Sequence, residues 1–337
     1  MKKKVITLLL ASVMAVSLMA CGGSANSTEE TPAASEEETP KENVPEEKEE
    51  AKADEKKVFG ATFMSLQNEH FQTITRGLQD WCDEHEGYEL VALDPDYDAS
   101  VQMQQLEDFI EMGIDGLFIS CVDGESIVPA LEKVMDAGIP VICVDDHPAN
   151  EDDVDGLVSA NNYMAGYQAG KALAEAINGE GEVAHIAYYI KNSTVVERDN
   201  GYYDALAEYP DIEIVDIQVA EGSTDTALPV AEDILTGYPD LKGFICVNDP
   251  TAQGAYSACE ASGRTDVKIV GVDGSQSAMK LIQQGKVVAT ASQRPYDMGK
   301  TAADQMEKIL NGEEIEHYIQ IDTVLIDASN VEEYIED

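Results

Sequence analysis

Apolar and polar residues alternate in a regular way from residue 57 onward, and their spacing predicts short strands separated by amphipathic helices. Apolar runs such as 57–64 and 88–94 have the length and composition of buried strands. Between these two runs, Asn68 is a favoured helix N-cap residue. The apolar residues after it recur three and four positions apart: Phe71, Ile74, Leu78 and Trp81. We therefore predict a helix here whose apolar stripe, Trp81 included, faces the core.

The same order of elements continues to residue 273. Further strands are predicted at 116–121, 139–145, 156–160, 182–190, 212–219, 243–249 and 267–273. Helices are predicted between them at 101–112, 125–137, 162–177, 197–209, 225–237 and 251–262. Strict alternation of this kind is typical of parallel sheets covered on both faces by helices. The predicted fold class is therefore α/β, with two successive lobes and a cleft between them.

The first 56 residues have a different pattern. Lys2 to Lys4 precede an apolar run at 5–19 that is too short for a lasting membrane span, and "LMAC" follows at 18–21. We expect a signal peptide at 1–20 and lipidation of Cys21, because the stretch resembles a bacterial lipobox. An ordinary secretory signal with an incidental cysteine is the alternative. Residues 21–56 are rich in Glu, Ser, Pro, Ala and Lys, which predicts a disordered acidic tether to the outer face of a cell membrane, as in Gram-positive lipoproteins.

The formal net charge of −45 limits the kinds of partner that the chain can have. Nucleic acids bind to clustered Lys and Arg, so a role in binding DNA or RNA is disfavoured. A neutral or cationic small molecule fits this charge better than an anionic one. With Cys21 set aside, five cysteines remain, an odd number that cannot pair completely. Because there is no C-x-x-C motif, they support neither a metal site nor a redox centre.

Polar residues stand where three of the predicted strands end. The stretches are "ICVDDHP" at 142–148, "ICVNDPT" at 245–251 and "IVGVDGS" at 269–275. In open α/β sheets, ligands bind beyond the carboxyl ends of the strands. We therefore expect the side chains at these strand ends to face a binding cleft.

These stretches, together with "LQNEHFQTITRGLQDW" at 66–81, "ERDNGYYDAL" at 197–206 and "ATASQRPYDMG" at 289–299, stand in a characteristic order. The chain from about 57 to 330 resembles the type I periplasmic binding proteins that bind ribose and galactose in bacterial uptake systems. The resemblance implies two lobes joined by a three-segment hinge, one formed by 57–160 and 294–322, the other by 161–293 and 323–337. It also implies that the lobes close on a ligand and then dock on the permease of an ABC transporter.

The resemblance further implies which side chains contact the ligand. Carried over residue by residue, they are Asn68, His70, Phe71, Asp145, Asp146, Asn162, Arg198, Asn248, Asp273 and Gln293. These residue types suit a sugar, because carboxylates accept from hydroxyl groups, Arg donates in a planar fork and amides do both. An aromatic face can cover the apolar side of the sugar ring.

Several of these residues have a structural alternative. Asn68 can be a helix cap only, Phe71 can belong to the core, and Arg198 can pair with the neighbouring acids. His70 stands where the family often has an aromatic residue. Asp146 replaces the Arg of the Asp-Arg pair in ribose binders and resembles the double Asp of arabinose-type binders, which puts ribose in doubt.

Functions other than that of a sugar-binding lipoprotein have less support in the sequence. "DPDYDASVQ" at 94–102 is similar to the start of a calcium loop, but Ala99 replaces the required Gly, so a helix-capping turn fits better. No nucleotide-binding or hydrolase motif supports an enzyme. A sensor of the same fold that signals to a membrane receptor or kinase, and a binder of a non-sugar small molecule, stay open as alternatives. We expect no cofactor, no metal and a monomer.

Overall fold

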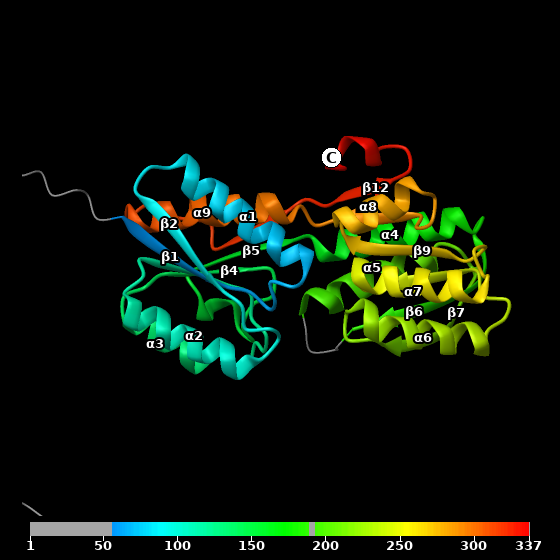
Figure 1. Cartoon of the computed structure of the whole chain (residues 1–337), viewed down its shortest axis with the longest axis horizontal. Coiled ribbons are helices and arrows are strands. Elements are labelled where there is room, and N and C mark those ends of the chain that lie inside the picture. The colour runs from blue at the N-terminus through cyan, green and yellow to red at the C-terminus, as the bar shows by residue number, and fades with distance from the viewer. Residues whose placement is uncertain (1–55, 189–192, 337) are drawn as a thin grey trace, which may run out of the picture. The chain divides into compact units, whose positions relative to one another are not determined.

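The computed structural model of the chain describes residues 56–188 and 193–336 (Figure 1). The predicted signal peptide, the lipidation site at Cys21 and the tether lie outside these described residues. No helix within the two described ranges is both long enough and apolar enough to cross a membrane.

The N-terminal lobe is built on a six-stranded sheet in which every neighbouring pair is parallel. The strand order is β11-β5-β4-β3-β1-β2. The strands are β1 (Lys57–Thr62), β2 (Tyr88–Leu93), β3 (Gly116–Ile119), β4 (Val141–Val144), β5 (Gly156–Ala160) and β11 (Tyr318–Ile321). The central strands β3 and β4 are buried along their whole length, as expected for a sheet with helices on both faces.

The C-terminal lobe contains a second six-stranded sheet in the order β12-β10-β9-β8-β6-β7. The strands are β6 (Glu180–Ala187), β7 (Asp211–Val219), β8 (Gly243–Cys246), β9 (Lys268–Asp273), β10 (Ala289–Ser292) and β12 (Val324–Asp327). All pairs are parallel except β10 with β12, which is antiparallel. The chain therefore repeats one architecture, as its alternating pattern predicts.

Helices cover both faces of each sheet (Figure 1). In the N-terminal lobe, α1 (Glu69–Glu84) and α9 (Pro295–Leu310) pack on one face, and α2 (Ala99–Met112) and α3 (Val128–Asp136) pack on the other. In the C-terminal lobe, α4 (Asn162–Ala176) and α5 (Ser193–Ala207) cover one face. The opposite face carries α6 (Thr224–Gly237), α7 (Asp249–Ser262) and α8 (Gln276–Gln283). Each sheet thus has two cores, one on each side.

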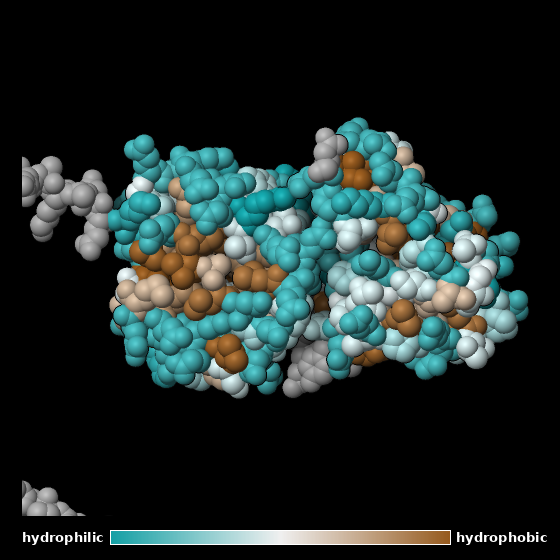
Figure 2. All heavy atoms as spheres, in the orientation of Figure 1, coloured by the Kyte–Doolittle hydropathy of each residue, from teal (hydrophilic) through white to brown (hydrophobic). Residues whose placement is uncertain are grey.

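The chain passes between the two sheets three times: from β5 to α4, from β10 to α9 and from β11 to β12. The first and third crossings are joined, because the Asn161 backbone N–H donates to the Ile321 carbonyl at 2.9 Å. The second crossing contains Gln293. On the face shown in Figure 2, mostly hydrophilic side chains border the line between the lobes, and apolar ones gather beside β1 and β2.

Most predicted elements are present with their ends shifted by a few residues. Trp81 is buried as predicted, and its indole N–H donates to Asp304 at 2.7 Å. The stretch at 94–102 is a helix-capping turn, in which Asp98 accepts from the backbone of Ser100 and Val101 at the start of α2. The hydrophobic pattern gave no separate prediction for α8, β10, α9, β11 or β12.

Candidate functional site

A cavity of about 60 Å³ lies between the two lobes, at the carboxyl ends of the strands. Nine of the ten ligand-contacting residues expected from the sequence line it; Asn162 is the exception. Its full lining is Met64, Asn68, His70, Phe71, Tyr97, Asp145, Asp146, Tyr188, Thr194, Val195, Arg198, Glu221, Gly222, Val247, Asn248, Asp273 and Gln293. We call this space the inner cavity.

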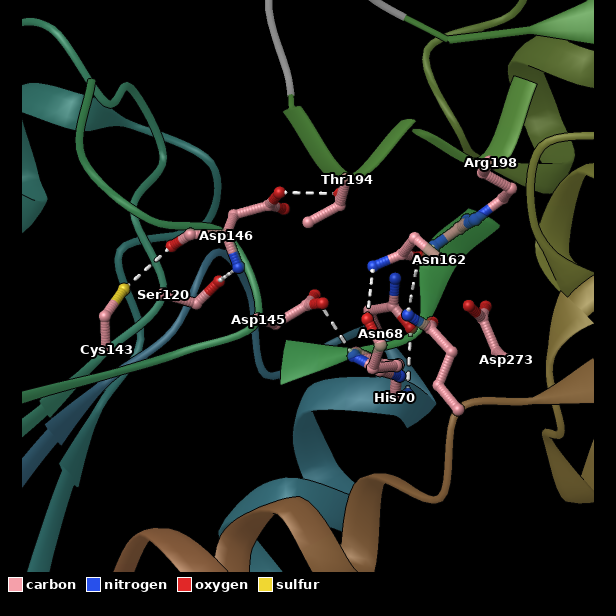
Figure 3. Close-up of polar contacts among 12 residues, drawn as sticks. Asn68, His70, Ser120, Cys143, Asp145, Asp146, Asn162, Thr194, Arg198 and Asp273 are labelled. Carbon is pink, nitrogen blue, oxygen red and sulfur yellow. Dashed lines mark hydrogen bonds and ion pairs between the residues drawn. The ribbon is translucent and has the colours of Figure 1, made fainter. Parts of the chain in front are cut away.

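A buried ion pair forms one wall of the inner cavity (Figure 3). His70 Nε2 lies 3.2 Å from Asp145 Oδ2, and both side chains are more than nine-tenths buried. Burial alone would lower the pKa of His70, but the charge and hydrogen bond of Asp145 raise it above its usual value. Burial would likewise raise the pKa of Asp145, but His70 and Arg198 outweigh it and lower that pKa. Each residue therefore stabilises the charged form of the other.

Two atoms of this pair are left without a partner by residues 56–188 and 193–336. His70 Nδ1 and Asp145 Oδ1 are buried and form no hydrogen bond with any described residue. An unpaired buried polar atom costs about 1 to 3 kcal/mol. A ligand in the inner cavity that both donates and accepts would satisfy these atoms.

Backbone strain is concentrated around the inner cavity. Asp145 follows β4 with φ of 76°, and Asp273 ends β9 with φ of 133°. Tyr97 (61°) and Glu221 (49°) also line the cavity and have positive φ. Non-glycine residues rarely adopt such angles, which cost on the order of 1 to 3 kcal/mol and cluster at functional sites. At Asp145 and Asp273 the unusual turn places a carboxylate at the end of a buried strand.

Arg198 enters the cavity from α5 and is only 5% exposed. Its guanidinium donates from Nη1 to the Val247 carbonyl at 2.6 Å and from Nη2 to Asn162 Oδ1 at 2.7 Å. Asn162 is fully buried and lies behind Arg198, not at the cavity surface. Arg198 Nε has no partner among the described residues, so it can donate to a ligand. The alternative expected from the sequence was that Arg198 pairs with the neighbouring acids. Its two Nη atoms instead donate to the Val247 carbonyl and to Asn162.

Two glycines allow this arrangement. A Cβ at Gly166 on α4 would collide with the carbonyl of Arg198, and a Cβ at Gly201 on α5 would collide with the carbonyl of Tyr163. The two helices therefore touch backbone to backbone. This close approach brings Asn162, the first residue of α4, within reach of Arg198.

Gln293 and Asp273 complete the wall near the crossings. In the amide orientation that pairs both of its ends, Gln293 donates to Asp273 Oδ1 at 3.0 Å and accepts from Arg198 Nη2 at 3.2 Å. Burial raises the pKa of Asp273 to about 6, although His70 and Arg198 pull it down. Behind it, burial and the charge of Asp273 raise the pKa of Asp249 to about 8. Asp249 accepts from Ser275 and Thr290 and so supports the turn that carries Asp273.

Asn68 and Asn248 are helix caps that also line the cavity. Asn68 Oδ1 accepts from the His70 backbone at 3.0 Å at the start of α1. Asn248 Oδ1 accepts from the Thr251 backbone at 3.0 Å at the start of α7. Phe71 likewise serves two roles, because it stacks on Phe63 in the core and its edge reaches the cavity. Each of these residues therefore has a structural role, as a helix cap or in the core, and also lines the cavity.

Contacts between the lobes flank the cavity on two sides. On one side, Thr194 Oγ1 of α5 donates to Asp146 Oδ1 at 2.8 Å (Figure 3). On the other, Glu69 at the start of α1 accepts from the Gln276 backbone at 2.6 Å and from Ser277 Oγ at 3.0 Å, at the start of α8. The carboxylate of one lobe thus caps a helix of the other, where the helix dipole favours negative charge.

Residues 59–314 of the chain match the sequence model of the family described as periplasmic binding protein domain. The chain belongs to the periplasmic binding protein family. The D-ribose/D-allose-binding protein of Pseudomonas aeruginosa is 31% identical over 277 residues, 79% of this chain and 86% of that protein. The ribose import binding protein of Bacillus subtilis is 29% identical over 271 residues, 80% of this chain and 87% of that protein. The expected family and fold class are confirmed.

Solved structures agree. A periplasmic solute-binding protein from Actinobacillus succinogenes with bound D-allose matches with a TM-score of 0.79 and 29% identity, over 83% of this chain and 100% of that one. A solute-binding protein from Bacillus halodurans with bound myo-inositol matches with a TM-score of 0.77 and 26% identity, over 83% of this chain and 98% of that one. The family consists of transport-binding proteins.

Sequence reasoning missed several lining residues of this periplasmic binding protein, chiefly Tyr97, Tyr188, Thr194 and Glu221. Tyr188 directly follows β6, so it is another strand-end residue and the rule applied to Asp145 could have found it. Tyr97 and Glu221 lie in loops after β2 and β7 and show no periodic pattern. Their positive φ angles are visible only in the structure.

The ion pair makes the stability of this periplasmic binding protein depend on pH. The pKa of His70 is raised from 6.5, so its contribution is complete below that pH and is lost as the pH rises through the folded-state pKa. The pKa of Asp145 is lowered from 3.8, so its contribution is present above that pH and is lost as the pH falls through the lowered value. Urea unfolding should therefore show a free energy of unfolding that falls as the pH rises above about 6.5.

In His70→Gln the free energy of unfolding should fall less steeply with rising pH, because the variant lacks the titrating imidazole. A single group contributes at most about 1.4 kcal/mol per pH unit to this slope. Asp249, with a pKa raised to about 8, also favours the folded state less as the pH rises, so part of the slope should persist in the variant. An unchanged slope in His70→Gln would show that His70 is not charged in the folded protein.

Proposed function

We propose that this periplasmic binding protein is an extracytoplasmic solute-binding protein that captures a monosaccharide-like polyol between its lobes and delivers it to an ABC permease. The observation that carries this proposal is the inner cavity, where Asp145, His70 and Arg198 each have a buried atom without a partner in the part of the chain that the structure describes. Relatives and matching structures that bind ribose, allose or myo-inositol support it. The site residues are proposed to bind the ligand without catalysing a reaction.

The hydrogen-bonding groups of the cavity match a polyol. Asp145 Oδ1 can only accept, Arg198 Nε can only donate, and His70 Nδ1 also donates in the charged imidazolium that Asp145 favours. A hydroxyl group donates and accepts, so hydroxyls on adjacent carbons can satisfy both kinds of partner. The groups come from both lobes, so a ligand that contacts them favours lobe closure.

The remaining parts of the proposal concern assembly. The lipid anchor at Cys21, the acidic tether, the two-lobe boundaries at 160 and 293, the monomeric state and a Gram-positive cell surface are all proposed from the sequence. A sensor of the same fold would use the same binding site, and only its partner would differ.

Isothermal titration calorimetry of the full-length protein tests the proposal. The panel contains D-ribose, D-allose, D-galactose, L-arabinose and myo-inositol, with sodium phosphate and an amino acid as unrelated ligands. We expect at least one polyol to bind with a micromolar or lower Kd, and neither unrelated ligand to bind. Binding of the unrelated ligands alone would overturn the assignment of ligand class.

A further inference from the structure

A second space adjoins the inner cavity. This outer chamber measures about 720 Å³ and is lined by Cys121, Val122, Asp123, Gly124, Glu125, His147, Pro148, Ala149, Ser193 and Ser223 together with five shared residues. The five residues shared with the inner cavity are Met64, Tyr97, Asp146, Tyr188 and Glu221. The two spaces therefore meet along a common wall.

The volume of the outer chamber is about twelve times that of the inner cavity. Small-molecule sites usually measure about 300 to 1,000 Å³, and buried water occupies about 30 Å³ per molecule. At about 60 Å³, the inner cavity is far below that range, whereas the outer chamber, at about 720 Å³, is within it. The inner cavity is thus smaller than a usual small-molecule site by itself, whereas the two adjoining spaces together have room for a small-molecule ligand.

Two tyrosines from opposite lobes stand where the spaces meet. Tyr97 belongs to the loop between β2 and α2 and is held in place by its backbone N–H, which donates to the Met64 carbonyl at 2.8 Å. Its φ of 61° is unusual for a bulky residue, and its side chain is nevertheless 47% exposed. A strained backbone that places a large aromatic residue at the wall of both spaces points to a ligand contact.

Tyr188 presents a second ring from the C-terminal lobe. It packs against Gly222, where a Cβ would come within 3.2 Å of the Tyr188 ring. Tyr188 and Tyr97 both line the inner cavity and the outer chamber. Aromatic faces bind the apolar side of sugar rings and other flat groups at little entropic cost.

The lining of the outer chamber includes both apolar and acidic residues. Val122, Pro148 and Ala149 supply apolar surface, while Glu125 and Glu221 bring negative charge. Negative charge disfavours a phosphate or carboxylate group in this chamber. A neutral group, flat or apolar on one face, fits it better.

We propose that the ligand is a neutral glycoside, whose sugar ring occupies the inner cavity and whose attached group passes between Tyr97 and Tyr188 into the outer chamber. This inference rests on the proposed function and narrows its ligand class. It makes Tyr97 and Tyr188 determinants of specificity for the attached group.

Calorimetry with matched probes tests the inference. The probes are D-ribose, D-glucose and D-galactose, each as the free sugar, the methyl β-glycoside and the phenyl β-glycoside. For the sugar that binds, we expect the phenyl glycoside to bind at least tenfold more tightly than the free sugar. The inference is overturned if the free sugar binds and both glycosides bind tenfold more weakly or not at all. If neither sugars nor glycosides bind, the proposed function fails and this inference fails with it.

Variants locate the attached group. Tyr97→Leu and Tyr188→Leu should each weaken binding of the phenyl glycoside at least tenfold more than binding of the free sugar. Ala149→Trp, which fills the outer chamber from an exposed position, should remove the preference for the phenyl glycoside, and it keeps the test valid if a tyrosine variant does not fold. Tyr167→Ala, on α4 away from both spaces, is the matched control and should change neither Kd. Equal losses for both probes in all three chamber variants would contradict the inference.

Discussion

Asp145→Asn should weaken binding of the sugar found in the calorimetric panel by about 30- to 1,000-fold. The carboxylate is the buried acceptor at the end of β4, and the charge-assisted hydrogen bonds that it makes to hydroxyl groups are worth about 2 to 4 kcal/mol together. The substitution also leaves the charge of His70, 3.2 Å away, without its counter-ion. Calorimetry at a pH near 6 measures the loss while His70 is still protonated.

Asp136→Asn provides the control for this loss. Asp136 is an exposed aspartate at the end of α3, in the same lobe, and it does not line either space between the lobes. Its substitution should leave the Kd unchanged. Full affinity in Asp145→Asn would place the ligand elsewhere, because an unpaired buried acceptor beside a bound polyol is too costly to go unused.

Arg198→Ala should reduce both ligand affinity and stability. Arg198 pairs with the Val247 carbonyl and Asn162 Oδ1, and its removal leaves both acceptors buried and unpaired. Breaking such a buried network typically costs about 3 to 5 kcal/mol. Chemical denaturation measures the fall in the free energy of unfolding, and calorimetry measures the loss of ligand binding.

Arg198→Lys separates the two effects. Lysine keeps the charge but cannot donate to both acceptors in one plane, so the variant should fold and still bind ligand at least tenfold more weakly. Lys133→Ala is the control, because the Lys133 side chain forms an exposed pair with Glu107 at 2.8 Å, which is worth about 0 to 1 kcal/mol. An Arg198→Lys variant with wild-type affinity would show that the guanidinium does not contact the ligand.

The fold was predictable because the spacing of apolar residues within each helix or strand indicates which of its faces is buried. The helix after Asn68 and the buried strand before Asp145 follow from local sequence alone. The carboxylates of Asp145 and Asp273 were predictable as neighbours of a cleft because the carboxyl ends of parallel strands share one edge. The resemblance to a known family added the remaining residues of the expected set.

Contacts between distant segments were not predictable in this way. Glu69 has the sequence context of an ordinary surface acid in a first helical turn, and its partners lie 207 and 208 residues later. Asn162 was expected to contact the ligand, but its side chain turns behind Arg198, because Gly166 and Gly201 let two helices meet. Such outcomes depend on how the elements pack in three dimensions, which no local pattern records.

The carboxyl end of the chain also joins the lobes. Glu336 forms a bidentate pair with Arg76 of α1 at 2.9 and 3.0 Å, and its backbone N–H donates to Gln276 Oε1 at 2.8 Å. A purification tag fused close to Glu336 would disturb these contacts. A fluorescent reporter there would respond when the contacts break. For affinity measurements, a tag is better inserted before residue 56; for a sensor that follows opening of the cleft, the carboxyl end is the better place for a dye.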